Sequence, residues 1–343
     1  MDFRLAFIGF GVVGQGLAEI LVQDKEKLEK EQGFTFKVVA IADKLKGSIY
    51  NANGLDLTKV LALAKDKKSL ELYDDAQLRG WDSIQTITDS NANVIVEVSW
   101  TDIATGEPAL THVKTALEQK KHVVMTNKGP IALEGKKLLD LAHKNGVQLK
   151  FEGTVLSGTP AINLGMNNLA GAGVTEVLGI VNGTTNYILC EMEKGLDYEQ
   201  ALKQAQELGY AEADPSGDVE GWDALGKVVI ITSTIMNYPM TKSQVEREGI
   251  TKITKEDIEQ AKKEGKRWKL IASSKINADG SVSGSVKPLK LPLNDPLASV
   301  MGPTNAITFK TKYLGDITIV GPGAGKEATG FALLADLLEI NRS

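Results

Sequence analysis

The chain has 343 residues, 42% of them hydrophobic and 24% charged, which is ordinary for a globular protein with room for two domains. Its net charge of −5 argues against nucleic acid as the main partner, and neither a charged-then-apolar leader nor a run of about 18 apolar residues predicts contact with a membrane. The single cysteine, Cys190, cannot form an internal disulfide and suits a reducing compartment, so we expect a cytoplasmic protein.

The first predicted elements are a buried strand at 5–8, a glycine-rich turn, and a helix from Val12 to about Glu29. In the turn, Gly9 permits the tight bend, Gly11 lets backbone N–H groups approach a phosphate, and Gly14 lets the helix pack close to the strand. This pattern predicts a dinucleotide pyrophosphate at the N-terminus of the helix.

The second predicted strand, 36–43, ends in Asp43, where a carboxylate would bind the hydroxyls of the adenosine ribose. Asp43 favours NAD, whose ribose is free. Lys44 and Lys46 follow at once and could hold the 2′-phosphate of NADP, so the sequence leaves the choice of cofactor open.

Strands and helices then alternate to about residue 150, which predicts a doubly wound parallel sheet of the Rossmann type, an α/β dinucleotide-binding domain over 1–150. The expected strands are 94–98 and 122–125, and the expected helices are 107–119 and 130–144.

From Val147 onward the pattern predicts a second, α+β domain over 151–320. The expected strands are 147–151, 175–181, 269–276, 281–286 and 306–311, and the expected long helices are 185–208 and 218–237. A last helix, 326–340, follows the glycine turn 321–325, and we expect segment 321–343 to complete the first domain.

Five acids lie within the twelve residues from Glu212 to Asp223, and the helix expected there places Asp223 and Lys227 one turn apart on the same face. A surface ion pair would have the same spacing. The apolar run 228–231 that follows indicates a buried helix, and a buried lysine beside a carboxylate is a candidate for proton transfer.

Two further loops carry polar side chains. Lys128 follows the strand ending near Met125, at the sheet edge where such folds bind ligands, and is either a ligand contact or a solvated loop lysine. Glu152 lies in a glycine-rich turn, 151–160, that could hold a hard cation or be only a turn.

Six motifs occur in order along the chain. They are Gly9-x-Gly11-x-Val13-Gly14, Thr126-Asn127-Lys128-x-Pro130, Glu152-x-x-Val155-x-x-Gly158-x-Pro160, the run Asn182 to Ile188, Gly209-Tyr210-x-Glu212-x-Asp214-Pro215 continuing to Asp223-x-x-x-Lys227, and the run Gly321 to Gly325. Through these motifs the whole chain resembles the homoserine dehydrogenase family.

The resemblance implies a homodimer or larger homo-oligomer that interconverts L-homoserine and L-aspartate 4-semialdehyde with NAD or NADP, in threonine and methionine biosynthesis. It implies that Lys227 is the general acid/base, with Asp223 and Lys128 beside it, and that Glu212, Asp218, Gly183 and Thr184 contact the substrate. The implied cofactor contacts are Gly9, Gly11, Val12, Val13, Gly14, Asp43, Lys44, Ser99, Lys128 and Gly325. Glu152 and the carbonyls of Val155, Ser157 and Thr159 resemble a sodium site of that family.

Two alternatives stay open at this point. Another amino-acid dehydrogenase, of the aspartate or diaminopimelate type, would use a similar nucleotide fold with a different acid/base set. A non-catalytic nucleotide sensor would bind the cofactor but would lack the buried pair of Asp223 and Lys227.

Overall fold

A computed structural model describes residues 2–102 and 104–343. The chain forms two compact units: unit 1 comprises 1–158 and 325–343, and unit 2 comprises 159–324. The boundaries therefore fall at 158/159 and 324/325, later in the chain than the predicted 150/151 and 320/321.

Unit 1 is built on a seven-stranded sheet with the order β4-β3-β2-β1-β5-β6-β7. The strands are β1 (Phe3–Ile8), β2 (Phe36–Asp43), β3 (Gly47–Tyr50), β4 (Leu78–Arg79), β5 (Val94–Glu97), β6 (His122–Met125) and β7 (Leu149–Lys150). Strands β2, β1, β5, β6 and β7 run parallel, and the residues of β5 are all buried, as expected of a sheet covered on both faces.

The expected sheet was wholly parallel, and β3 and β4 correct this, because both pair antiparallel. Only residues 44–46 separate β2 from β3. A connection that short makes a hairpin, whereas a parallel pair needs a crossover of a dozen or more residues.

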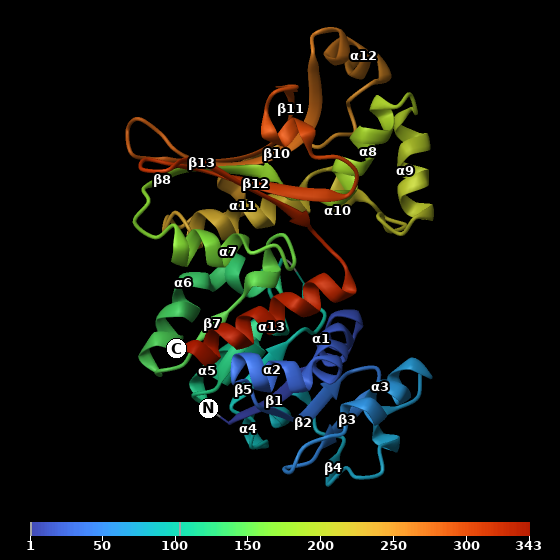
Figure 1. The fold of residues 1–343 in the computed structure, drawn as a ribbon, viewed down its shortest axis with the longest axis vertical. Helices are drawn as coiled ribbons and strands as arrows, with labels where there is room; N and C mark the ends of the chain where they lie inside the picture. Colours follow the sequence, from blue (N-terminus) through green and yellow to red (C-terminus); the bar gives the residue numbers. More distant parts are fainter. Residues whose placement is uncertain (1, 103) are drawn as a thin grey trace. The chain divides into compact units, whose positions relative to one another are not determined.

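The helices of unit 1 are α1 (Val12–Gln23), α2 (Lys25–Gln32), α3 (Leu57–Lys65), α4 (Ser83–Asp89), α5 (Ala109–Glu118), α6 (Lys128–Lys144) and α13 (Lys326–Arg342), with the 3₁₀ turns η1 (Leu70–Leu72) and η2 (Glu152–Thr154). The single helix expected over 12–29 is two helices, because Asp24 leaves the helical conformation. Helices α1 and α13 pack side by side (Figure 1), and a Cβ added to Gly16 would lie 2.4 Å from the carbonyl oxygen of Lys326.

Unit 2 contains a six-stranded sheet with the order β13-β12-β8-β10-β11-β9. The strands are β8 (Val174–Ile180), β9 (Val245–Arg247), β10 (Lys266–Ile276), β11 (Val282–Pro292), β12 (Thr304–Thr311) and β13 (Gly315–Pro322), and all neighbours pair antiparallel except β9 with β11. The helices are α7 (Ala161–Asn163), α8 (Gly183–Glu193), α9 (Tyr198–Glu207), α10 (Ser216–Val219), α11 (Trp222–Thr234) and α12 (Lys255–Lys263), with short turns η3 (Leu164–Asn168), η4 (Lys242–Gln244) and η5 (Pro296–Ser299).

The two long helices expected in unit 2 are each broken in two. Gly195 at φ +112° and the capping box of Asp197 separate α8 from α9, and Gly221 at φ +84° separates α10 from α11. Glycine adopts positive φ without strain, so it ends one helix and lets the next start in a new direction. A helix does start near Asp218, but it is the short α10, and Asp223 lies in the first turn of the separate helix α11.

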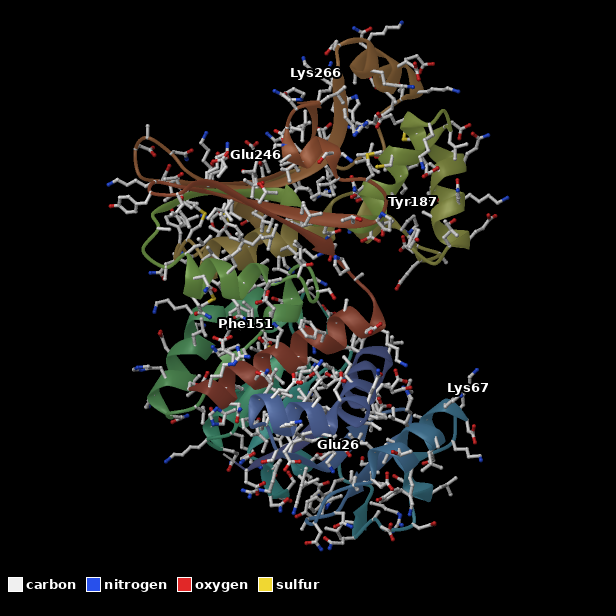
Figure 2. All side chains as sticks on the ribbon, viewed as in Figure 1. Glu26, Lys67, Phe151, Tyr187, Glu246 and Lys266 are labelled. Carbon is white, nitrogen blue, oxygen red and sulfur yellow. The ribbon has the colours of Figure 1, made fainter. Side chains whose placement is uncertain are left out.

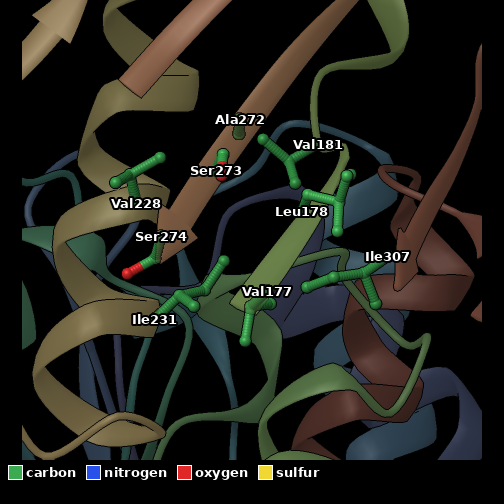
Figure 3. Close-up of a pocket in the computed structure, with 10 residues that line it drawn as sticks. Val177, Leu178, Val181, Val228, Ile231, Ala272, Ser273, Ser274 and Ile307 are labelled. Carbon is green, nitrogen blue, oxygen red and sulfur yellow. The ribbon is translucent and has the colours of Figure 1, made fainter. Parts of the chain in front are cut away.

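Helix α11 lies against the sheet of unit 2 through apolar side chains. Val228 and Ile231 face Val177 of β8 and Ser274 of β10, and the space among them is too tight for a water molecule (Figure 3). Charged side chains such as Lys67 and Glu246 lie instead on the outside of the two units (Figure 2). In the described part of the chain, no helix combines the length and the apolar character needed to cross a bilayer.

Candidate active site

The glycine turn after β1 has the geometry of a phosphate-binding loop. Gly9 adopts φ +95°, and a Cβ there would lie 2.6 Å from the carbonyl oxygen of Val98, so only glycine fits. A Cβ on Gly11 would meet no atom within 4 Å, which leaves the start of α1 open to a ligand. No side chain caps α1, so its first backbone N–H groups can bind an anion.

Asp43 joins this turn to the end of β2. Its carboxylate accepts hydrogen bonds from the backbone N–H groups of Phe10 (2.7 Å), Leu45 (3.0 Å) and Lys46 (2.9 Å). A carboxylate can accept about four hydrogen bonds, so Asp43 retains capacity for a ribose hydroxyl. Lys44 is exposed and Lys46 half-buried in the short hairpin that follows.

A second group of polar side chains lies at the carboxyl ends of β5 and β6, which pair so that Glu97 is opposite Met125. The fully buried carboxylate of Glu97 accepts hydrogen bonds from Ser99 N (2.8 Å), Ser99 Oγ (2.6 Å) and Asn127 Nδ2 (2.9 Å). His112 Nδ1 lies 2.7 Å from its other oxygen. The half-buried Lys128 follows Asn127 as the first residue of α6.

The turn around Glu152 is held against α13. Glu152 is 1% exposed, and its backbone N–H donates to Asp336 Oδ2 at 3.0 Å. Burial raises the pKa of Asp336 well above its usual range, and the nearby Glu152 carboxylate raises it further. Leu156 and Ser157 both adopt positive φ, so the turn is tightly wound where its carbonyls would bind a cation.

Of the other residues implied in the cation site, Val155 lies in unit 1 and Thr159 begins unit 2. Gly325, implied as a cofactor contact, is the N-cap of α13 at φ +126°. Val12 and Val13 begin α1, and the side chain of Val12 is largely exposed.

In unit 2, the buried Lys227 and the half-buried Asp223 form an ion pair on α11. Lys227 is 6% exposed, and its Nζ donates to Asp223 Oδ2 at 2.7 Å and to the carbonyl oxygen of Val181 at 2.5 Å. The spacing that also suited a surface ion pair therefore belongs to a pair whose lysine is buried. Two acceptors from different elements fix the position of the ammonium group.

Asn182, the N-cap of α8, joins this pair to Asp218. Its Nδ2 donates to Asp218 Oδ1 at 2.7 Å and to Asp223 Oδ2 at 3.0 Å. Its Oδ1 accepts from the backbone N–H of Thr185 at 2.9 Å, which fixes the orientation of the amide. The two carboxylates thus share one neutral donor between them.

The other residues expected to contact the substrate differ in how deeply they are buried. Burial raises the pKa of Asp218, against hydrogen bonds from Asn182 and Thr184 that lower it. Thr184 is buried next to Gly183, where a Cβ would lie 2.5 Å from the carbonyl oxygen of Pro303. Glu212 is exposed on the loop between α9 and α10.

Comparison with known families decides the identity of the chain. A family profile described as homoserine dehydrogenase, NAD binding domain, matches residues 9–152, and one described as homoserine dehydrogenase matches residues 160–338. The chain belongs to the homoserine dehydrogenase family. Its activity is that of a homoserine dehydrogenase, an oxidoreductase that uses NAD or NADP, and the expected α/β fold class is confirmed.

Individual homoserine dehydrogenases match over almost the whole chain. An NAD(+)-dependent homoserine dehydrogenase from Pseudomonas canavaninivorans is 44% identical, covering 100% of this chain and 97% of the relative. A homoserine dehydrogenase from Methanocaldococcus jannaschii is 41% identical, covering 99% and 98%.

Solved structures of homoserine dehydrogenases match as well. A hyperthermophilic archaeal homoserine dehydrogenase in complex with NADPH superimposes with a TM-score of 0.84 at 30% identity, covering 99% of this chain and 98% of that one. The enzyme from Thiobacillus denitrificans superimposes with a TM-score of 0.85 at 31% identity, covering 100% and 74%. These matches disfavour the aspartate or diaminopimelate type and the non-catalytic sensor.

No role was predicted from the sequence for four members of the two groups, one of which is Asn127 of the motif 126–130. Glu97 and His112 carried no motif, since Glu97 was expected only as a strand residue and His112 only as a helix residue. Asn182 was part of a family motif without a role, although an asparagine after a strand and before a helix is a recognisable N-cap signal.

Proposed function

We propose that unit 1 of this homoserine dehydrogenase holds the dinucleotide, that unit 2 holds L-homoserine, and that Lys227 exchanges the proton in the interconversion with L-aspartate 4-semialdehyde. The observation that carries this proposal is the contact of the buried Lys227 with the half-buried Asp223, which Asn182 links to Asp218. The nicotinamide, when bound, supplies or accepts the hydride.

In the oxidation of L-homoserine, the terminal hydroxyl group gives its proton to the neutral amine of Lys227 as the carbon gives up its hydride. In the reduction, the ammonium of Lys227 protonates the aldehyde oxygen as the carbon receives the hydride. Asp223 Oδ2 and the carbonyl of Val181 accept hydrogen bonds from Nζ and hold it in place through both steps. Electrons and protons balance without a further reactant.

Residues beside the pair would bind the polar groups of the substrate. The carboxylate of Asp218, which Asn182 links to the pair, and that of Glu212, a position of the family motif, suit its ammonium group. The buried Thr184 and the close-packed turn at Gly183 would shape the space around the substrate. Lys128 would contact either the cofactor or a carboxylate of the substrate.

The dinucleotide would lie along the carboxyl edge of the unit 1 sheet. We assign the pyrophosphate to the turn 9–14, where Gly9, Gly11 and Gly14 would bring the backbone close and Val12 and Val13 open the helix. We assign the adenosine ribose to Asp43, with Lys44 beside it, and contacts beyond the pyrophosphate to Ser99, Lys128 and Gly325. The bound NADPH of the archaeal relative and the NAD(+) dependence of the Pseudomonas relative support both cofactors.

Two finer assignments complete the proposal. A monovalent cation such as sodium would bind Glu152 and the carbonyls of Val155, Ser157 and Thr159, which is supported by the buried acids Glu152 and Asp336. The enzyme would work as a homodimer or larger homo-oligomer in the cytoplasm. Exposed apolar side chains at Tyr313, Leu314 and Val320 of unit 2 support self-association.

The test is an assay of NADH and NADPH formation with L-homoserine, L-aspartate and diaminopimelate as alternative substrates. Turnover of L-homoserine with at least one cofactor, and none with the other two amino acids, is the expected result. Turnover of L-aspartate or diaminopimelate in preference to L-homoserine would overturn the substrate assignment. Cofactor binding without turnover of any of them would overturn the catalytic role of Lys227.

A further inference from the structure

Glu97 is a charged residue in a strand whose other members are valine and isoleucine. Its side chain is fully buried at the carboxyl end of β5. Burying a carboxylate costs several kcal/mol, and an apolar residue of similar volume often supports the fold as well or better. Stability of the sheet therefore does not account for a carboxylate at this position.

The partners of Glu97 show what the carboxylate organises. Its Oε1 accepts three hydrogen bonds, from Ser99 N, Ser99 Oγ and Asn127 Nδ2. Ser99 lies in the segment after β5, and Asn127 lies in the segment after β6. Asn127 is the N-cap of α6, yet its side chain does not cap that helix. The amide donates to Glu97 instead, so the carboxylate fixes where α6 and Lys128 begin.

His112 anchors the other oxygen of Glu97. Its Nδ1 lies 2.7 Å from Glu97 Oε2, and both side chains are less than one-tenth exposed. His112 belongs to α5, which precedes β6 in the chain. The carboxylate is therefore held from α5 while it holds the two segments at the sheet edge.

The order of the strands indicates which part of the dinucleotide these segments would meet. Asp43 ends β2, the glycine turn follows β1, and Ser99 and Asn127 follow β5 and β6, in the sheet order β2-β1-β5-β6. With the adenosine ribose at β2 and the pyrophosphate at β1, the remaining half of the cofactor reaches β5 and β6.

We propose that Glu97 and His112 are positioning residues for the nicotinamide half of the cofactor. Glu97 holds Ser99 and the start of α6, and His112 holds Glu97. The proposal rests on the proposed function, because it takes unit 1 as the dinucleotide site.

The experiment compares NADH with ADP-ribose, which lacks only the nicotinamide ring at this end, on purified full-length Glu97→Gln. The glutamine keeps the size of the side chain but replaces one carboxylate oxygen with an NH2 group, which lies either against His112 or against the donors of Ser99 and Asn127. We expect the Kd for NADH to rise about tenfold, as for loss of one hydrogen bond to a charged group, and the Kd for ADP-ribose to stay within about twofold. If the enzyme prefers NADP, NADPH and 2′-phospho-ADP-ribose replace the two probes.

His112→Asn is the second variant, and it tests the anchor without altering Glu97. The same selective loss of NADH affinity is expected, with a higher KM for the cofactor and an unchanged KM for L-homoserine. His122→Gln is the matched control, because His122 begins β6 at the opposite end, where its Nδ1 accepts from the backbone N–H of Gln148 at 3.1 Å. This control should bind both probes as the parent does.

Equal weakening of NADH and ADP-ribose in both variants would overturn the proposal, because Glu97 would then support only the fold of unit 1. Unchanged NADH affinity in both variants would overturn it as well. Failure of the parent enzyme to bind either dinucleotide or ADP-ribose would instead refute the proposed function of unit 1, so the two failures are distinguishable.

Discussion

In unit 1 the carboxylate of Glu97 accepts hydrogen bonds from Ser99 and Asn127, whereas in unit 2 the carboxylate of Asp223 pairs with the ammonium of Lys227. Hydroxyl and amide donors such as those of Ser99 and Asn127 keep their protons, so the carboxylate that accepts from them serves to position these residues. A lysine held by a carboxylate can release its proton and take it back. The first arrangement suits binding and the second suits chemistry.

Each arrangement depends on an asparagine between a strand and a helix. Asn127, before α6, donates to Glu97 and does not cap its helix, while Asn182, before α8, caps its helix and donates to two carboxylates. Changes in unit 2 should therefore act mainly on kcat, and changes in unit 1 should act mainly on the affinity for the cofactor.

The largest effect is expected from Lys227→Ala, which removes the proposed proton carrier of unit 2. The kcat should fall by about two to four orders of magnitude, the usual contribution of a general acid/base, while cofactor affinity and the far-ultraviolet circular dichroism stay unchanged. Lys227→Arg should not restore turnover, because a guanidinium group does not give up its proton at neutral pH. Steady-state kinetics of L-homoserine oxidation measure both variants.

Lys203→Ala is the matched control for this prediction. Lys203 also stands four residues from an acid, Glu207, but that pair is exposed on α9 with its charged atoms 3.9 Å apart. Its removal should leave kcat within about twofold, since exposed pairs contribute little. Loss of a general acid/base lowers kcat by about a hundredfold or more. A Lys227→Ala enzyme that kept about a third or more of the parent kcat would therefore contradict the role of Lys227.

A smaller effect on kcat is expected from Asn182→Asp. The aspartate keeps an acceptor for the N–H of Thr185 but removes the donor shared by Asp218 and Asp223 and adds a third carboxylate. The kcat should fall by about one to two orders of magnitude, as for a buried acceptor left unsatisfied. The added negative charge favours the ammonium of Lys227, so the pH at which homoserine oxidation reaches its maximum should move upward.

Asn127→Asp is the counterpart in unit 1 and sharpens the comparison. It places a carboxylate against Glu97, so it should raise the KM for the cofactor and leave the pH dependence of kcat unchanged. A pH profile that moved in Asn127→Asp and stayed fixed in Asn182→Asp would reverse the roles assigned to the two units.

These predictions rest on features that the sequence revealed unequally. The spacing of Asp223 and Lys227 and the acid that ends β2 are local patterns, so both could be predicted, as could most strands of unit 1. The roles of Asn182 and Glu97 depend on contacts far along the chain: Asn182 binds residues 36 and 41 positions away, and Glu97 binds Asn127 at 30. The periodicity of hydrophobic residues, which predicts helices and strands, carries no information about such long-range contacts.

The errors in the expected helices have a local cause that was visible but ambiguous. Gly195 and Gly221 break the two long helices of unit 2 because each adopts positive φ. Glycine also occurs inside helices of this chain, as Gly226 does in α11, so its presence alone does not mark a break. The short hairpin between β2 and β3 was not predicted, because Lys44 and Lys46 were interpreted only as candidate cofactor contacts.

In unit 1, Glu152→Ala should remove a dependence on monovalent cations. The Tm of the parent enzyme should rise with added NaCl relative to choline chloride at equal ionic strength, because a bound cation stabilises only the folded state. Glu152→Ala should show no difference between the two salts, since carbonyl groups alone bind a cation weakly. Differential scanning fluorimetry measures the shift, and Glu118→Ala, at the exposed end of α5, controls for the loss of one charge. Identical Tm values for the parent in both salts would argue against a cation at Glu152.

The smallest effect is expected from the double variant Lys44→Ala with Lys46→Ala. Lys46 donates to Asp43 through its backbone N–H, which alanine retains, so the double variant leaves the hairpin and the ribose contact in place. Removal of the two ammonium groups should weaken NADP binding by about tenfold, since two exposed contacts to a phosphate at about 0.7 kcal/mol each sum to about 1.4 kcal/mol. It should spare NAD, which lacks the 2′-phosphate. The variant Lys25→Ala with Lys37→Ala removes two exposed lysines elsewhere in unit 1 and has the same net charge, so it isolates the local effect. Binding titrations with both cofactors give the ratio of affinities. An equal loss for NAD and NADP would show that the two lysines support the hairpin rather than select the cofactor, and unit 1 would then owe its choice to Asp43 alone.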